Sequence, residues 1–275
     1  MNVLVLVSMA LAGFLALWIA QVVLLVRAGE PWPWRKWPLR HRCEKPLVRW
    51  GMKAALQGVL LALLFGFPAV IGEDPIDYHR DRLHPANWWL FGGILLSAVL
   101  AMCPMFLLNV LFGWVTVAPH YDTARSVKKL ARCLITPVPL AFVEEALFRG
   151  VVLDTLLRAL PGRAGMVLAV LLGAAIFAAV HFFRPQKRVL LPALGLFGLG
   201  VILGSAYILG GYSYWLPVAI HAGGVVFIQV SRPFVEYKGP PWLVGYSSYP
   251  ICGLLGVTSM ALYVLGLGLW LSGGV

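Results

Sequence analysis

The amino-acid sequence predicts an all-α fold, a polytopic membrane bundle of about eight transmembrane helices. Hydrophobic residues make up 60% of the chain and charged residues only 12%, and the mean hydropathy is +0.85. Soluble globular domains carry about 25% charged residues. The apolar residues also gather in windows of roughly 18 or more, about the length of helix that crosses a hydrocarbon core about 30 Å thick. We therefore expect one integral-membrane domain over residues 1–275.

Eight apolar windows define the expected spans. In chain order they cover residues 2–26, 51–71, 88–115, 134–157, 164–183, 190–209, 212–231 and 250–272. The first window follows no basic residue and is too long for the core of a signal peptide, so we expect a retained span. The third is long enough to tilt in the bilayer or to end in an interfacial segment. The sixth and seventh are separated only by a turn at Gly210, Gly211 and Tyr212.

The basic residues predict the orientation of the bundle. The net charge is +11, and 17 of the 22 Lys and Arg residues lie in alternate connections, at 27–53, 125–132, 184–188 and 232–238. The positive-inside rule places these connections in the cytoplasm and both termini on the outer side. The charge thus reflects orientation in a lipid bilayer, and we expect no nucleic-acid partner. The short loops favour a multi-pass protein of the bacterial inner membrane.

Ionisable residues inside the predicted spans are the candidates for a functional site. A charged side chain near the bilayer centre costs about 2.5–3.5 kcal/mol, so such residues usually face the interior of a bundle and mark a site. The candidates are Glu144, Glu145, Arg149, Asp154, His181 and His221.

The segment FVEEALFRG contains two adjacent carboxylates with different expected partners. Glu145 and Arg149 are four residues apart, in the favourable order for an ion pair on one helix face. Glu144 lies about 100° away around the helix and has no intrahelical partner at that spacing. Asp154 and Arg158 repeat the spacing near the outer end and predict a terminal ion pair. The alternative for the trio at 144–149 is that it only ties helices together.

The two histidines lie at a depth similar to that of Glu144. His181 ends the string FAAVH, four residues after Phe177, and His221 lies within WLPVAIHAGG. At 1.5 Å per residue from the nearest predicted cytoplasmic boundary, all three side chains lie roughly 5–16 Å deep. A carboxylate and two imidazoles in a wet cavity fit two hydrolytic chemistries. In one, the carboxylate is a general base on water; in the other, all three side chains bind Zn²⁺.

These motifs resemble those of a known family. EEALFR fits E-E-x-x-x-R, FAAVH fits F-x-x-x-H and HAGGV begins as H-x-x-x-N, in that order on successive predicted helices. The chain resembles the CAAX-protease and bacteriocin-processing family of intramembrane proteases, which includes the prenyl-protein endopeptidase of the Rce1 type. The resemblance covers a protease core at about residues 130–231.

The resemblance implies an activity and a role for each motif residue. It implies an intramembrane endopeptidase that acts on a membrane-associated protein or peptide, with Glu144 activating the attacking water. His181 would share the water or its proton, and His221 would help to bind the oxyanion. Glu145 and Arg149 would orient Glu144 or hold the helix, and Phe177 belongs to the supporting motif. The implied mechanism needs no cofactor; if it depends on metal, Glu144, His181 and His221 would bind it.

One position departs from the family pattern. The fourth residue after the last histidine is often Asn in the family, and here it is Val225, which cannot donate a hydrogen bond. Losing one oxyanion donor costs about 10²–10³ in rate in hydrolases. Gln229 or Tyr212 could replace the donor. The alternative function is a proteolytically silent relative, acting as a membrane scaffold, immunity factor or transport accessory.

Overall fold

The computed structural model describes residues 2–29, 45–83, 88–118, 123–181, 190–246 and 250–273. These residues are almost entirely helical. The helices are α1 (Asn2–Arg27), α2 (Pro46–Val70), α3 (Pro75–Arg80), α4 (Trp88–Leu100), α5 (Cys103–Leu111), α6 (Thr123–Ile135), α7 (Pro137–Glu145), the π-helix η2 (Ala146–Leu153), α8 (Asp154–Ala159), α9 (Gly162–His181), α10 (Leu190–Leu209), α11 (Trp215–Ser231), α12 (Pro241–Val244), the 3₁₀-helix η3 (Pro250–Cys252) and α13 (Leu254–Gly273). Strands β1 (Val115–Val117) and β2 (Val235–Tyr237) pair antiparallel.

Every predicted span contains a helix, but only some of these helices are long enough to cross a bilayer on their own. Within the described part of the chain, six segments are long and apolar enough: α1, the 50–70 part of α2, α4 with α5, α9, most of α10, and α13. The seventh predicted span is the shorter apolar helix α11, and the fourth is divided into α7, η2 and α8. The all-α class and a multi-pass membrane protein are confirmed, while the count of eight stays a prediction.

The third predicted span, which was expected to tilt or to end in an interfacial segment, consists of two helices. Helix α4 ends at Leu100, and α5 begins at Cys103 with Pro104 in its first turn. Proline lacks a backbone N–H and disfavours helical geometry in the residue before it, so it is favoured in the first turn of a helix and often interrupts a longer one. The apolar window is therefore two helices joined by a short turn.

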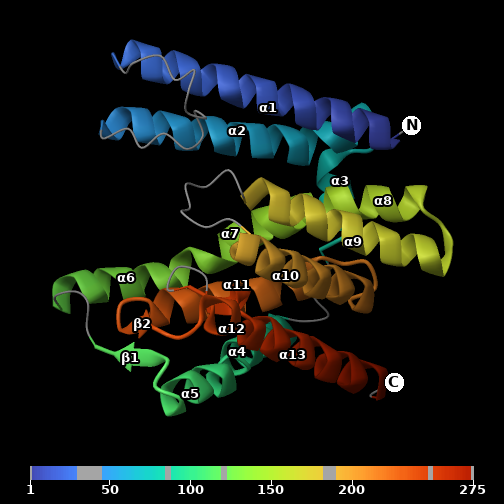
Figure 1. Ribbon diagram of the computed structural model, residues 1–275. Coiled ribbons are helices and arrows are strands. Elements are labelled where there is room, and N and C mark those ends of the chain that lie inside the picture. Colours follow the sequence, from blue (N-terminus) through green and yellow to red (C-terminus); the bar gives the residue numbers. More distant parts are fainter. Residues whose placement is uncertain are drawn as a thin grey trace.

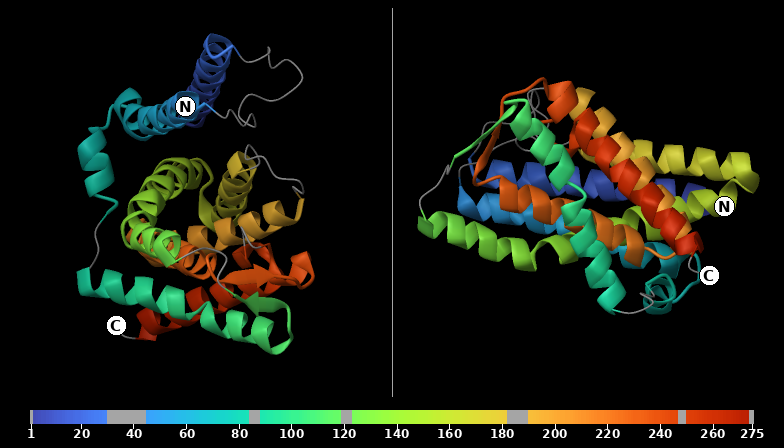
Figure 2. Two further views of the ribbon diagram at one scale, coloured as in Figure 1. Left: turned by 90° about the vertical axis from the view of Figure 1, so that its left-hand side faces the viewer. Right: turned by 90° about the horizontal axis from the view of Figure 1, so that it is seen from below.

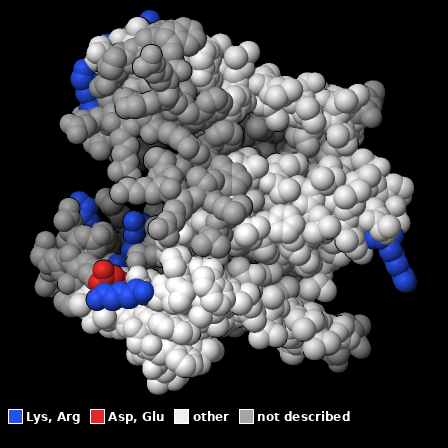
Figure 3. Space-filling view, viewed as in Figure 1, with Lys and Arg blue, Asp and Glu red and all other residues white. Residues whose placement is uncertain are grey.

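The helices run roughly side by side, with α1 and α2 as an antiparallel pair along one edge (Figures 1 and 2). Both termini lie at the same end of the bundle, and α6, β1 and β2 lie at the other (Figure 1). An even number of spans would place both termini at the same end. On the face shown in Figure 3, described Lys and Arg side chains lie toward the two ends of the molecule, and the surface between is largely uncharged.

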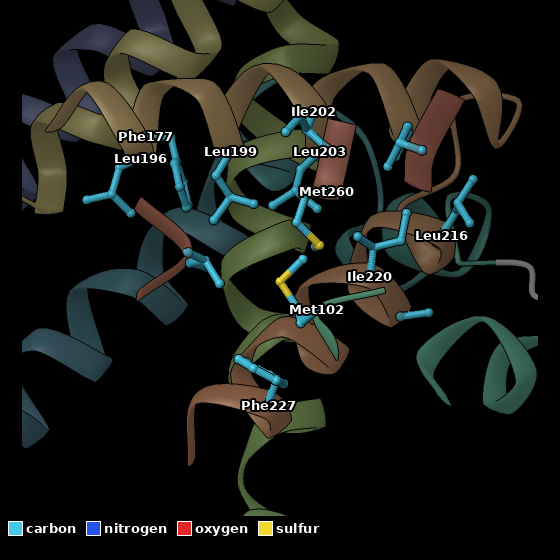
Figure 4. Close-up of a cluster of buried hydrophobic side chains, with 14 of the residues drawn as sticks. Met102, Phe177, Leu196, Leu199, Ile202, Leu203, Leu216, Ile220, Phe227 and Met260 are labelled. Atoms are coloured by element: carbon cyan, nitrogen blue, oxygen red, sulfur yellow. The ribbon is translucent and has the colours of Figure 1, made fainter. Parts of the chain in front are cut away.

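Among the described residues, two large clusters of buried side chains form the interior, and a smaller one lies between α1 and α2. One lies between α4, α10, α11 and α13 and includes Met102, Leu203, Leu216, Ile220 and Met260 (Figure 4). The other joins α2, α7, η2 and α10 and includes Phe67, Ala146, Val151, Tyr207 and Tyr214. Large apolar side chains also cover the outer faces of the helices, where Leu11, Leu171 and Trp270 are exposed. Apolar interior and apolar exterior together are expected of a bundle whose outer faces meet lipid tails.

A glycine allows α9 and α10 to approach at backbone distance. A Cβ atom added to Gly200 would lie 2.8 Å from the Cα atom of Ala174 on α9. The backbone oxygen of Gly200 also accepts a hydrogen bond of 3.3 Å from Arg149 Nη2. Gly200 therefore fixes the distance between α10 and two elements that carry site residues, since His181 ends α9 and Arg149 lies on η2.

Gly200→Ala is expected to destabilise the protein by about 1–3 kcal/mol, because the added methyl group overpacks a rigid backbone contact. The measurement is thermal unfolding of the purified protein in detergent. Gly266→Ala is the matched control, since a Cβ atom at this α13 position meets nothing within 4 Å. Equal melting temperatures for the two variants would contradict this account of the helix contact.

Helix α3 anchors the connection between α2 and α4 to the bundle. Tyr78 Oη donates a hydrogen bond of 2.5 Å to the Gly150 carbonyl, and Tyr214 Oη donates one of 2.8 Å to the His79 carbonyl. The His79 ring donates from Nε2 to the Leu64 carbonyl at 2.8 Å. Burial lowers the pKa of His79, which keeps the ring neutral in this contact. The connection is thereby held against η2 and α11.

Asp154 contacts several side chains at the end of the bundle where α3 lies. The predicted ion pair with Arg158 is confirmed, at 3.0 Å from Nε to Oδ2. Arg82 Nη2 lies 3.2 Å from the same oxygen, and Tyr207 Oη lies 3.4 Å from Oδ1. Asp154 thus joins α8 to α10 and to the α3 connection, which is more than a terminal pair on one helix.

Candidate active site

Three predicted residues from three helices converge at one place. Glu144 lies in the last turn of α7, His181 ends α9 and His221 lies within α11. Glu144 Oε2 is 3.9 Å from His181 Nε2 and 3.8 Å from His221 Nε2. The three side chains are 16%, 10% and 9% exposed, in that order. The structure therefore brings together a carboxylate and two imidazoles that are 37 to 77 positions apart in the chain, in a largely buried site.

The hydrogen bonds of the two rings define which nitrogen faces Glu144. His181 Nδ1 lies 2.8 Å from the Phe177 carbonyl, and His221 Nδ1 lies 2.7 Å from Glu145 Oε1. A carbonyl and a carboxylate can only accept, so each ring donates from Nδ1. In a neutral ring the Nε2 atom is then an acceptor. Both Nε2 atoms are directed at Glu144, where each accepts a hydrogen bond in a neutral ring and donates one in an imidazolium.

The separation between these atoms suits a bridging water. Distances of 3.8 and 3.9 Å are too long for direct hydrogen bonds. A water about 2.8 Å from each of two such atoms fits between them, and a polar site with several partners is where an ordered water is stable. The arrangement can therefore hold one water between a carboxylate base and two imidazoles.

Glu145 and Arg149 form the predicted ion pair, which lies next to this site. Arg149 Nη1 lies 3.0 Å from Glu145 Oε2, and the two side chains are 2% and 0% exposed. Arg149 Nη2 donates to the Gly200 carbonyl, and its guanidinium carbon lies 4.8 Å from the ring centre of Phe177. The contact between Glu145 and His221 was not predicted, because the sequence indicates intrahelical spacings and not which helix packs opposite.

A π-helix follows the two glutamates directly. Helix α7 ends at Glu145, and all eight residues of η2 from Ala146 to Leu153 are buried. Short π-helical stretches within α-helices are frequent at functional sites, and their wider turn changes the face on which later residues lie. Nothing in the hydrophobic pattern signalled this change of helix type.

Phe177 packs against both imidazoles. Its ring centre is 4.6 Å from that of His181 and 6.3 Å from that of His221, and it also meets Phe148 at 5.1 Å. Phe177 is 1% exposed. The phenylalanine of the F-x-x-x-H motif thus restricts the orientation of the two histidine rings.

The two residues considered as replacements for the missing donor have contacts of their own. Gln229 Oε1 accepts a hydrogen bond of 3.2 Å from Thr136, at the start of α7. Tyr212 lies in the turn before α11, where its ring packs edge-on to Tyr207. The idea that Tyr212 serves the site is wrong, because it lies at the end of the bundle where Asp154 lies. Val225 itself is half-buried on α11, one turn after His221.

The distances between the three side chains also bear on the alternative in which they bind Zn²⁺. Ligands about 2.0–2.1 Å from a tetrahedral Zn²⁺ lie about 3.3 Å from one another. The distances from Glu144 to the two imidazoles are longer, and among the described residues no group of three or more His, Cys, Asp or Glu side chains could hold a metal ion. The site as it stands does not fit Zn²⁺.

Comparison with known proteins addresses the family. The model of the type II CAAX prenyl endopeptidase Rce1-like family matches residues 126–227. No curated protein and no solved structure matched the chain. The matched segment contains Glu144, His181 and His221, together with the Glu145–Arg149 pair. The resemblance read from the motifs is therefore confirmed: over residues 126–227 this multi-pass membrane protein matches the Rce1-like family of CAAX endopeptidases.

Proposed function

We propose that this protein is an intramembrane endopeptidase that hydrolyses a peptide bond of a membrane-associated protein or peptide, with Glu144 activating water. One observation carries the proposal. Glu144 Oε2 lies 3.8 and 3.9 Å from the Nε2 atoms of two histidines on other helices. Buried ionisable groups are expensive in a membrane bundle, so their convergence in one place favours a chemical role.

The proposed reaction begins with proton transfer from water to Glu144. The water oxygen attacks the carbonyl carbon, and the proton held by Glu144 later passes to the leaving amine. His181 Nε2 accepts a hydrogen bond from the water and orients it. The carbonyl oxygen gains negative charge in this step, so a nearby donor stabilises the transition state.

His221 supplies that donor in the proposal, with Glu145 as its positioning residue. The Nδ1–H group of His221 lies 2.7 Å from Glu145 Oε1. A carboxylate in this position holds the ring and stabilises an imidazolium, as the aspartate does in the Ser-His-Asp triad. An imidazolium at His221 donates from Nε2 toward the oxyanion. Glu145 and Arg149 thereby act on His221 and not on Glu144.

The test is a comparison of protein termini in membranes. Cells that produce the wild-type protein or Glu144→Gln at matched levels are analysed for new N-termini by mass spectrometry. Peptides cut only in the wild type identify the cleavage site and are then synthesised for assay with the purified protein in H₂¹⁸O. One ¹⁸O atom in the new carboxylate is expected, and the assay is repeated after chelation. Identical sets of termini in the two samples would reject the protease.

The second candidate is a proteolytically silent protein that acts as a membrane scaffold, immunity factor or transport accessory. The observation in its favour is Val225, which cannot donate a hydrogen bond, while Gln229 Oε1 accepts from Thr136 and the Tyr212 ring packs against Tyr207. In this case Glu144→Gln keeps its biological activity and no cleavage accompanies the wild type.

Val225→Asn is expected to raise the rate of cleavage by about 10²-fold, because it adds a donor one turn from His221 on the same helix face. The measurement is the rate of hydrolysis of the identified peptide under single-turnover conditions. Val226→Asn is the matched control, since Val226 is also half-buried but lies about 100° around α11. Equal rates for both variants would mean that position 225 does not face the oxyanion.

A further inference from the structure

A second polar site lies away from Glu144, at the end of the bundle that carries Asp154. A cavity of about 520 Å³ opens between α8 and the start of α9. Asp154 is ten residues after Glu144, so it lies roughly 15 Å from Glu144 along the helix axis. The proposed hydrolysis uses none of the residues that line this cavity.

The lining of the cavity carries excess positive charge. Two arginines line it, Arg158 and Arg163. Arg158 lies 3.0 Å from Asp154 and 3.4 Å from Glu73, so its charge is already paired. Among the residues that the structure describes, Arg163 has no carboxylate within 4 Å. A cavity with one guanidinium left over favours an anionic ligand, and guanidinium suits phosphate because it can form two parallel hydrogen bonds.

The cavity lies beside the ends of two candidate spans, where lipid headgroups are expected. The candidate span of α9 starts at Gly162 and that of α10 ends at Leu209, so both end beside it. Tyr212, three residues after the end of α10, lines the cavity and is 50% exposed. Tyrosine and arginine at the ends of spans are typical of the membrane interface.

The face of α9 beneath Arg163 indicates the rest of the ligand. Val167 and Leu171 follow Arg163 at intervals of four residues and therefore lie on the same helix face. They are 56% and 40% exposed. The cavity itself is also lined by Leu157 and Met166. An arginine next to a stripe of exposed apolar side chains matches a phosphate with an attached acyl chain. A soluble anion would contact the arginine and not the apolar stripe.

We propose that this cavity binds the headgroup phosphate of an anionic phospholipid, with Arg163 and Tyr212 on the headgroup and an acyl chain along Val167 and Leu171. A bound lipid would cover the junction of α8 and α9, beside Asp154 and its ion-pair partners Arg82 and Arg158. The site is independent of the proposed hydrolysis, so it can be tested in a protein of any activity.

The test measures the binding of fluorescent phosphatidylglycerol to the purified full chain in detergent. Saturable binding is expected, and Arg163→Gln is expected to weaken it about fivefold, as one basic residue contributes about that factor at an anionic headgroup. Met166→Trp fills the cavity and is expected to weaken binding as well. Arg80→Gln is the matched control, because Arg80 is an exposed arginine of α3 that pairs with Asp77 and does not line the cavity.

Two further arms identify the ligand class. Phosphatidylcholine, which is zwitterionic, is expected to compete at least fivefold less well than phosphatidylglycerol, and inorganic phosphate is expected not to compete at millimolar concentration. Unchanged binding by both Arg163→Gln and Met166→Trp would overturn the site. Equal competition by phosphatidylcholine would overturn the preference for anionic lipid, and full competition by phosphate would assign the cavity to a soluble anion instead.

Discussion

Glu144→Gln is expected to lower the rate of peptide-bond hydrolysis by about 10²–10⁴-fold, the usual contribution of general-base catalysis. The amide has nearly the shape of the carboxylate but cannot accept the proton of the attacking water. The Glu144 side chain is 16% exposed and is not the partner of Arg149, so the protein should insert and purify as the wild type does. The rate is measured in single turnover with the peptide identified from cell membranes.

Three further variants test whether the loss of activity is specific to the site. His181→Ala and His221→Ala are expected to be about as slow as Glu144→Gln, and combining them should add little, because residues that act as one unit lose activity together. Glu236→Gln is the control, since Glu236 is an exposed carboxylate on β2. More than a tenth of the wild-type rate in Glu144→Gln would remove Glu144 from the role of base.

Glu145→Leu is expected to destabilise the protein by about 3–5 kcal/mol, the largest stability effect foreseen for this chain. Arg149 is 2% exposed, and without Glu145 its guanidinium keeps, among the described residues, the 3.3 Å contact to the Gly200 carbonyl and the Phe177 ring. Removing one partner of a buried ion pair leaves an uncompensated charge. Thermal unfolding in detergent measures the loss.

The double variant Glu145→Leu with Arg149→Met separates stability from positioning. Replacing a buried ion pair by apolar residues of similar volume is often neutral for stability, so the melting temperature is expected to return close to that of the wild type. Hydrolysis is expected to stay slow, because His221 Nδ1 has lost the carboxylate at 2.7 Å. A double variant that is both stable and fully active would limit Glu145 to a structural role.

Much of the fold followed from hydropathy and spacing. The windows at 2–26 and 164–183 correspond closely to α1 and α9, because a long apolar run in a nearly uncharged stretch has no alternative to a helix in lipid. The window at 88–115 corresponds to one candidate span over Trp88–Leu111, which consists of α4 and α5 joined by a short turn. The 212–231 window was right in place, but α11 is shorter than a full span.

The sequence indicated which residues lie at the candidate site better than it indicated the contacts between them. Intrahelical spacing identified the Glu145–Arg149 and Asp154–Arg158 pairs, because four residues bring two side chains onto one face of a helix. It could not reveal that Arg82 also meets Asp154, 72 positions earlier in the chain. Contacts of this kind depend on which helices are neighbours, and a single sequence carries no spacing rule for them.

The sequence by itself determined the apolar helices, their order and the set of ionisable residues that they bury. Only the tertiary structure decided how the two adjacent glutamates divide their partners, with Glu144 near both Nε2 atoms and Glu145 on Nδ1 of His221. The physical reason is that the rotation of each helix about its axis is set by packing against other helices. Here Phe177, the close approach at Gly200 and the π-helix after Glu145 set that rotation.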